Sequence, residues 1–268
     1  MNHDLKYAVN CSLLFTEVPL LQRPAAAAAA GFSAVEFWWP WPDQPAPDGH
    51  EVDDFVGAVQ DAGVQLIGLN FFAGDLAGAD AGVVSLPRRV DEFRDNVDVV
   101  VGIGQALKVP AFNALYGVRV DDASPEQQDE VAAENLALAA DAVARIGGVV
   151  LVEPVSGPKP YPLRTADDVV AVLDRVNAAN VAMLCDLFHL ANNGDDLEAA
   201  IARHADRVGH VQIADLPGRH EPGSGELDLD RYLRQLEAAG YRGRVALEHV
   251  PSDSTLDSLT WLPVERRR

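Results

Sequence analysis

The sequence is poor in cysteine and lacks long hydrophobic runs. Its only two cysteines, Cys11 and Cys185, each lie inside an apolar segment, so we expect buried reduced thiols rather than a disulfide. No run of about eighteen apolar residues is present to span a bilayer. The first ten residues also lack the basic, apolar and small-residue order of a secretory signal. These absences predict a cytoplasmic protein without a membrane partner.

Basic residues are few relative to acidic ones. Lysine and arginine together number 21, aspartate and glutamate number 41, and the formal net charge is −20. A surface this acidic repels phosphate backbones and anionic membranes. We therefore expect no nucleic-acid partner.

The chain lacks a glycine-rich phosphate loop after its first expected strand, which argues against an open doubly wound sheet. Short apolar runs instead alternate with segments of helical period, the pattern of repeated strand–helix units. Eight strands are expected at 7–12, 34–39, 64–70, 109–115, 149–154, 181–186, 208–215 and 244–249. Helices are expected at 19–30, 52–62, 88–106, 125–146, 165–178, 195–205 and 228–239. With no linker or composition shift, residues 1–268 are predicted to form a single-domain (β/α)₈ TIM barrel, an α/β fold.

Several helix ends are marked by capping residues. Ser124 and Thr165 are expected N-caps, and Gly63 lies where a helix should end. Pro24 conflicts with a helix over 19–30, because an interior proline costs roughly 3 kcal/mol. A kink, or a helix that begins at Pro24, would resolve this conflict. The segment 253–262 is expected to be a tail or a final short helix.

Four consecutive strands, the fifth to the eighth, carry polar residues at their C-terminal ends, where a barrel places its active site. These residues are Glu153, Asp186, Gln212 and Glu248. At about 4 Å and an effective dielectric near 20, each pair of like charges among them costs on the order of 4 kcal/mol. A positive group must therefore lie between these side chains.

The positive group has two possible sources. Each acid could pair with its own basic residue, but the neighbouring segments offer few: Lys159, Arg164 and Arg219. Alternatively, one divalent ion neutralises the whole group. Three carboxylates and an amide oxygen suit Mg²⁺ or Mn²⁺, with Co²⁺ possible, and suit structural Zn²⁺ poorly. An octahedral ion with these four ligands keeps two positions for a substrate carbonyl and its neighbouring hydroxyl.

Two further residues are candidates for substrate binding. The loop 216–226 follows the strand of Gln212 and contains Arg219, whose forked donors can hold an anionic group or hydroxyls. His189 comes three residues after Asp186. The alternative for His189 is a purely supporting role, as a histidine hydrogen-bonded beside the metal ligands.

With these residues, the chain resembles the hydroxypyruvate isomerases. They are a branch of the xylose-isomerase-like TIM barrels that also include ketose epimerases and inosose dehydratases. The most specific stretch is "HVQIADLPGRHEPGSGELD" at 210–228, followed by "FTEVP" with "AAAAAAGF" near the N-terminus. The resemblance implies that Glu153, Asp186, Gln212 and Glu248 bind the metal. It also implies that Glu153 and Glu248 transfer the proton, that His189 and Arg219 contact substrate, and that the protein is a homo-oligomer. One departure is the aromatic, proline-rich segment 38–47, which we expect to border the pocket.

The expected activity is a metal-dependent isomerisation in carbohydrate metabolism. Hydroxypyruvate and tartronate semialdehyde would interconvert through an enediolate, with proton transfer by Glu153 and Glu248. The nearest alternative is a ketose epimerase, or an isomerase of 2-oxo-tetronate or another sugar, that uses the same residues. Phosphodiester cleavage is disfavoured, because it would call for clustered histidines and a basic face, whereas the chain has seven histidines and a charge of −20. A non-catalytic sugar-binding protein is a third alternative.

Overall fold

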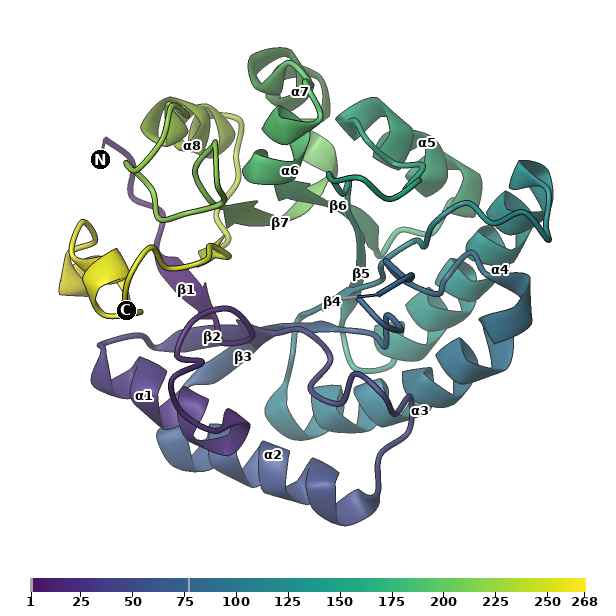
Figure 1. Ribbon diagram of the computed structural model, residues 1–268, viewed down its shortest axis with the longest axis horizontal. Helices are drawn as coiled ribbons and strands as arrows, with labels where there is room; N and C mark the ends of the chain where they lie inside the picture. Colours follow the sequence, from purple (N-terminus) through teal and green to yellow (C-terminus); the bar gives the residue numbers. More distant parts are fainter. Residues whose placement is uncertain (1, 77) are drawn as a thin grey trace.

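Eight parallel strands form a closed barrel in the computed structural model, which describes residues 2–76 and 78–268 (Figure 1). Each strand pairs with the next along the chain, and the last pairs with the first. The strands are β1 (Tyr7–Asn10), β2 (Ala34–Phe37), β3 (Gln65–Asn70), β4 (Ala111–Asn113), β5 (Val149–Val152), β6 (Val181–Asp186), β7 (Val208–Ile213) and β8 (Val245–Leu247). The expected (β/α)₈ barrel is confirmed.

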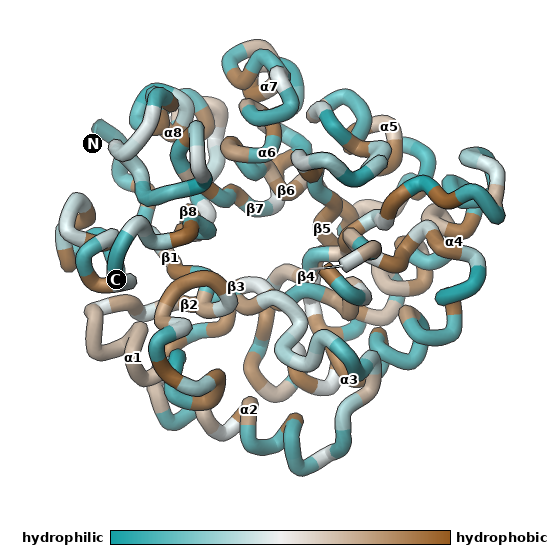
Figure 2. The backbone as a smooth tube through the Cα atoms, in the orientation of Figure 1, coloured by the Kyte–Doolittle hydropathy of each residue, from teal (hydrophilic) through white to brown (hydrophobic). Residues whose placement is uncertain are grey.

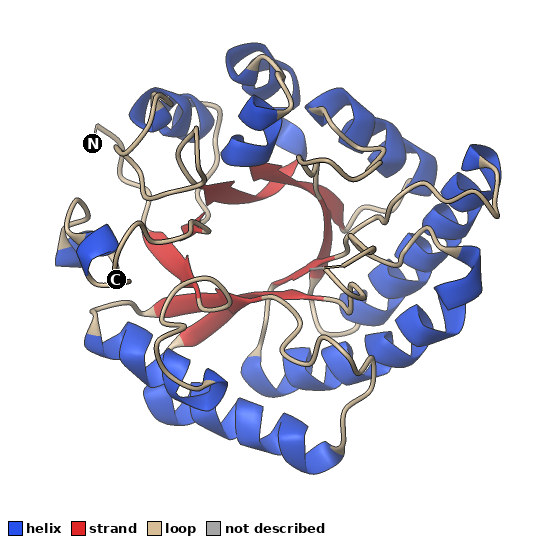
Figure 3. Cartoon of the chain, in the orientation of Figure 1, coloured by secondary structure: helices blue, strands red, loops and turns tan. Residues whose placement is uncertain are grey.

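Helices surround the barrel, as Figure 3 shows in blue around the red strands. The α-helices are α1 (Arg23–Ala29), α2 (Gly49–Ala62), α3 (Val90–Leu107), α4 (Pro125–Ala144), α5 (Ala166–Val176), α6 (Leu187–Asn192), α7 (Leu197–His204) and α8 (Leu229–Ala238). Short 3₁₀ helices are η1 (Leu20–Gln22), η2 (Pro87–Arg89), η3 (Ala205–Arg207), η4 (Asp257–Leu259) and η5 (Val264–Arg266). None of the helices in the described residues combines the length and the apolar character needed to cross a bilayer.

Most of the expected helix ends are confirmed. The side chains of Ser124 and Thr165 accept hydrogen bonds from backbone N–H groups in the first turns of α4 and α5, and Gly63 ends α2 with a φ of 67°. Pro24 lies in the first turn of α1, where no intrahelical N–H is needed. The conflict at Pro24 is therefore resolved by a helix that starts at Arg23.

One helical segment differs from the expectation, and one near the C-terminus agrees with it. Helix α6 was not expected, because it begins directly at the end of β6 and lasts only six residues. Its cap is Asp186, whose side chain accepts from the backbone N–H of His189 at 3.0 Å. Near the C-terminus, the segment 253–262 contains the short 3₁₀ helix η4, which agrees with the expected tail or short helix.

Alternating strand residues divide the core into two parts. Outward-facing residues such as Val9 and Val35 pack against the helices, and Figure 2 shows hydrophobic and hydrophilic stretches alternating along those helices. Inward-facing residues form two small apolar clusters inside the barrel, namely Ala8, Ala34, Ile67 and Ala246, and Ala111, Leu151 and Leu184. Cys11 and Cys185 are both buried and free, as expected.

Candidate active site

Every strand places a carboxylate or amide side chain at or next to its C-terminal end, and all eight side chains are buried. On most strands this residue follows an inward-facing apolar residue by two positions, so both point into the barrel. We call these residues the polar ring: Asn10, Glu36, Asn70, Asn113, Glu153, Asp186, Gln212 and Glu248. The four predicted metal-binding residues are the half of the ring contributed by β5 to β8.

Glu153 and Asp186 lie close together, with His189 beside them. One potential ligand atom of each of these three residues lies within 4.8 Å of the others. The Glu153 carboxylate accepts a hydrogen bond from Asn113 Nδ2 at 2.6 Å. Burial and the nearby charges of Glu248 and Asp186 nevertheless raise the pKa of Glu153 well above its usual value. Without a further positive group, this environment favours the protonated form of Glu153.

Glu248 and Gln212 form the other side of the site. Glu248 is not a member of the close group around Glu153, but its Oε1 accepts from Gln212 Nε2 at 3.2 Å and from Trp38 Nε1 at 2.6 Å. Burial raises the pKa of Glu248 to about 7, although the charge of Arg219 lowers it. The contact with Trp38 confirms that the segment 38–47 reaches the pocket.

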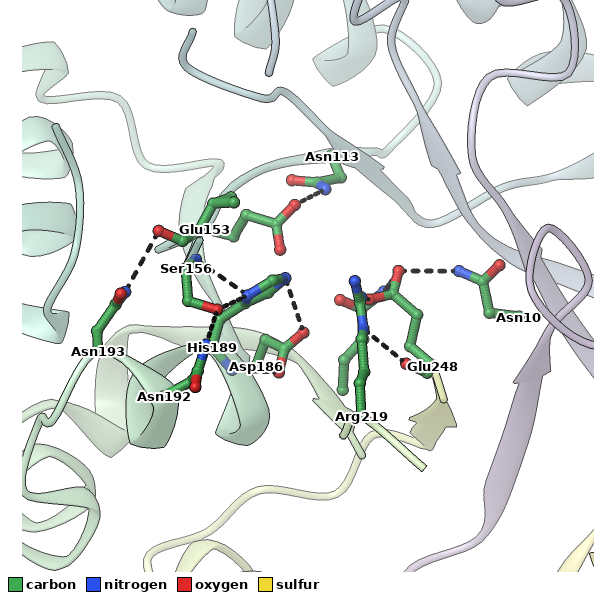
Figure 4. A network of polar contacts seen from close by, with 12 residues as sticks. Asn10, Asn113, Glu153, Ser156, Asp186, His189, Asn192, Asn193, Arg219 and Glu248 are labelled. Atoms are coloured by element: carbon green, nitrogen blue, oxygen red, sulfur yellow. Dashed lines mark hydrogen bonds and ion pairs between the residues drawn. The ribbon is translucent and has the colours of Figure 1, made fainter. Parts of the chain in front are cut away.

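Arg219 lies between the two groups. Figure 4 shows its guanidinium beside Glu248, on the side that faces Asp186 and His189. The guanidinium forms an ion pair with the Glu248 carboxylate, and Arg219 Cζ lies 5.5 Å from the centre of the Phe188 ring. Arg219 thus supplies positive charge to the site and reaches the cavity from the loop 216–226.

The loop that carries Arg219 is held by Asp215, which lies two residues after the end of β7. Its carboxylate accepts from the backbone N–H groups of Leu216, Gly223 and Leu227 at 2.8, 2.8 and 3.0 Å. At Gly225, a Cβ atom would lie 2.3 Å from the Leu216 carbonyl oxygen, so only glycine fits this crossing. The strand ends at Ile213, two residues before the expected limit at Asp215, because the chain turns there.

His189 has a defined hydrogen-bonding role. Its Nδ1 accepts from the backbone N–H of Ser156 at 3.0 Å, so in the neutral ring the hydrogen is on Nε2, which lies 3.7 Å from Asp186 Oδ2. Burial lowers the pKa of His189 to about 4, against the opposing effect of Asp186. The ring is therefore neutral at pH 7 and presents an N–H donor to the cavity.

A cavity of about 210 Å³ lies above the ring, lined by residues that include Trp38, Glu153, Lys159, His189, Arg219 and Glu248. The Lys159 ammonium donates to the backbone carbonyls of Leu76, at 2.8 Å, and of Asp80. It thereby joins the segment after β5 to the segment after β3 at the mouth of the cavity. Of the three cations expected near the acids, Arg164 does not line this cavity within the described residues.

Sequence reasoning missed the half of the ring contributed by β1 to β4. Asn10 Nδ2 donates to Glu248 Oε1 at 3.1 Å, and Gln212 Nε2 donates to Glu36 at 2.7 Å, so both missed residues touch predicted ones. His210, two residues before Gln212, pairs with Glu36 and was missed as well. A sequence pattern could have identified these residues, because a polar residue follows an inward-facing apolar residue by two positions on β1, β2 and β4.

The residues of the ring fit a hard divalent cation. Glu153 and Asp186 bring carboxylate oxygens close together in buried positions, and Gln212 Oε1 is buried without a hydrogen-bond partner among the described residues. A buried amide oxygen without a partner is the kind of atom that a cation would satisfy. The oxygen-rich set matches the preference of Mg²⁺ and Mn²⁺.

Comparisons with known proteins agree with the barrel. A family model described as the xylose isomerase-like TIM barrel matches residues 24–263. A solved structure from Brucella melitensis, described as AP endonuclease, family 2, superposes with a TM-score of 0.87 at 34% identity, covering 96% of this chain and 97% of that one.

Curated relatives cover almost the whole chain. A Streptomyces coelicolor protein provisionally named a hydroxypyruvate isomerase is 52% identical over 98% of this chain and 98% of its own length. The hydroxypyruvate isomerase of Escherichia coli is 30% identical, over 96% of this chain and 98% of that protein. A 2-oxo-tetronate isomerase of Pectobacterium atrosepticum is 31% identical, over 96% of both chains.

Proposed function

The chain belongs to the xylose isomerase-like TIM barrel family, in which it is an isomerase, and we propose that it interconverts hydroxypyruvate and tartronate semialdehyde. This reaction takes a proton from C3 of hydroxypyruvate and adds one at C2, while the hydroxyl proton at O3 is lost and one is gained at O2. No oxidant or reductant is needed. The protein therefore has to move protons and stabilise the enediolate between the two forms.

The observation that carries this proposal is the pair of buried glutamates at the cavity. Glu153 and Glu248 lie on opposite sides of His189 and Arg219 in Figure 4, and both line the cavity. A carboxylate beside the substrate can accept a proton and, as the carboxylic acid, return it at the neighbouring carbon. We assign proton transfer to Glu153 and Glu248, with either one acting first.

We propose that Glu153, Asp186, Gln212 and Glu248 hold a divalent ion, Mg²⁺ or Mn²⁺, with Co²⁺ as an alternative. When bound, such an ion supplies Lewis acidity that stabilises negative charge developing on substrate oxygens. The Nε2–H of His189 would donate to a substrate oxygen, since the neutral ring has its other nitrogen occupied by Ser156.

The positive residues and the cavity size support a short acidic substrate. Arg219 can bind a substrate carboxylate through the guanidinium donors that Glu248 does not occupy, since Nε and Nη2 already donate to Glu248. The cavity of about 210 Å³ is smaller than the roughly 300–1,000 Å³ of sites for drug-sized ligands. A three-carbon acid fits these features, and the four-carbon 2-oxo-tetronate is the alternative, because a relative with similar coverage carries that name. A ketose epimerase acting on longer sugars is less well supported by this volume.

The proposal is tested by following exchange of the substrate C–H with D₂O by NMR, with hydroxypyruvate or 2-oxo-tetronate and added Mn²⁺ or Mg²⁺. We expect metal-dependent exchange, faster with the three-carbon acid, and loss of exchange in Glu248→Gln. Glu226→Gln, which changes an exposed glutamate, is the matched control and should retain exchange. Full exchange in Glu248→Gln would refute the assignment, and absence of exchange with any hydroxy-carbonyl compound would favour a binding protein.

A homo-oligomer also remains part of the proposal, on the strength of the family resemblance. The cytoplasmic location remains a proposal from the sequence features described above. Nucleic acid is not proposed as a substrate, since the net charge of −20 opposes binding to phosphate backbones.

A further inference from the structure

A buried glutamate–histidine pair lies inside the barrel, next to the predicted metal ligand Gln212. Glu36 of β2 and His210 of β7 are only 3% and 5% exposed, and His210 Nε2 lies 2.8 Å from Glu36 Oε2. The two strands are not neighbours, so the pair spans the barrel interior. Within the described residues, neither side chain is among those that line the cavity.

The second oxygen of Glu36 binds two amide groups. Its Oε1 accepts from Gln212 Nε2 at 2.7 Å and from Asn10 Nδ2 at 2.9 Å. A carboxylate can only accept, so each amide must present its nitrogen to Glu36. The oxygen of Gln212 is consequently turned away from Glu36, and it is the buried oxygen that has no partner among the described residues.

The same two amide nitrogens also reach Glu248. Gln212 Nε2 and Asn10 Nδ2 lie 3.2 and 3.1 Å from Glu248 Oε1. Glu36 therefore fixes the amides that in turn hold one oxygen of Glu248. The position of one carboxylate outside the cavity affects two of the four predicted ligands.

Glu36 itself has little freedom to move. Gly68 lies opposite it on β3, and a Cβ atom at Gly68 would lie 3.3 Å from both Cβ and Oε2 of Glu36. With His210 beside Oε2, the carboxylate is enclosed by β3 and β7. Because Gly68 has no side chain, it leaves room for the carboxylate of Glu36.

We propose that Glu36, held by His210, is a positioning residue that sets the amide of Gln212 with its oxygen toward the metal site. The inference rests on the proposed metal-dependent function. A ligand that is oriented before the ion arrives needs less ordering on binding, which is why partners of metal ligands affect affinity.

The test compares Glu36→Met with the isosteric Glu36→Gln. Both remove the charge, but glutamine keeps an oxygen that can accept from Gln212 Nε2. Titration calorimetry with Mn²⁺ should show affinity about 10- to 100-fold weaker in Glu36→Met. Glu36→Gln should recover most of that loss. Equal loss in the two variants would overturn the proposal, because it would show that only the charge matters.

A second comparison asks whether Glu36 acts through Gln212. In a background that combines Gln212→Ala with Asn10→Ala, Glu36→Met and Glu36→Gln should bind Mn²⁺ equally, since neither amide remains to be oriented. A difference that persists in this background would overturn the proposal. If circular dichroism shows that Glu36→Met is unfolded, Glu36→Ala, which leaves room for water, replaces it with the same expectations.

The two proposals fail differently. Wild-type protein that binds no Mn²⁺ overturns the metal-dependent function and the positioning role together. Wild-type protein that binds Mn²⁺, together with a folded Glu36→Met variant of equal affinity, overturns the positioning role alone.

Discussion

The interior of the barrel changes character over two residues of a single strand. On β5, Leu151 packs in an apolar cluster with Ala111 and Leu184, and Glu153 two positions later lies in the polar ring. Both side chains are almost fully buried. They therefore differ in chemistry and not in exposure.

The difference shows how the barrel separates stability from chemistry. The apolar layer loses no hydrogen bonds on burial and contributes the free energy of removing apolar surface from water. The polar ring crowds Glu36, Glu153, Asp186 and Glu248 into a buried space, where Arg219 forms an ion pair with one of them. Burying like charges costs free energy, and folding of the layer below offsets that cost.

The largest expected effect on activity comes from Glu153→Gln in the polar ring. Glutamine keeps an oxygen for Asn113 but cannot transfer a proton, so isomerisation should fall by about 10²- to 10⁴-fold. The free energy of unfolding without added metal should stay constant or rise, because a buried charge is removed. Steady-state kinetics and urea denaturation measure the two effects. Activity within about tenfold of wild type would contradict the assignment of chemistry to the polar ring.

Leu151→Ala should have the opposite profile. Loss of a buried leucine side chain should lower the free energy of unfolding by about 2–5 kcal/mol, since a cavity is left in the apolar layer. Activity per folded molecule should stay close to wild type, because the polar ring is unchanged. Urea denaturation gives the stability, and a rate measured well below the unfolding transition gives the activity. A variant that is stable but inactive would contradict the proposed division.

The smallest expected effect concerns His3, near the N-terminal end of β1. Burial and then the charge of Arg266 lower the pKa of His3, so the folded state favours the neutral ring. The unfolded chain takes up the proton first as the pH falls below about 6.5. The contribution of neutral His3 to the free energy of unfolding is therefore present above that pH and is lost as the pH decreases.

Denaturation at pH 7.5 and 5.5 should therefore show a larger loss of stability in wild type than in His3→Gln. The isomerase activity of the variant at pH 7.5 should be unchanged, because His3 lies outside the cavity in the described residues. A parallel pH dependence in both proteins would exclude this contribution from His3.

The sequence predicted the barrel because each strand is a short apolar run with helical segments on either side. It also predicted the polar ends of β5 to β8, since Glu153, Asp186 and Glu248 follow apolar residues directly. Their assignment as ligands and proton-transfer groups stays a prediction.

The remaining residues were harder to predict for physical reasons. Glu36 lies inside the apolar, aromatic run 34–39, where one acid does not reveal whether its side chain faces the barrel interior or solvent. Asn10 and Asn113 resemble the asparagines common at strand ends. The partner of Glu36, His210, is 174 residues away in sequence and is identified only once the barrel is closed.

Lys159 places a limit on what can enter the cavity. The Lys159 ammonium connects the segment after β5 to the backbone of the segment after β3. Neither segment can move away from the cavity without breaking the hydrogen bonds from Lys159. A substrate too wide for this mouth would need the tie to open before it could reach Glu153. Lys159 therefore restricts the entrance on this side, separately from the residues proposed to transfer the proton.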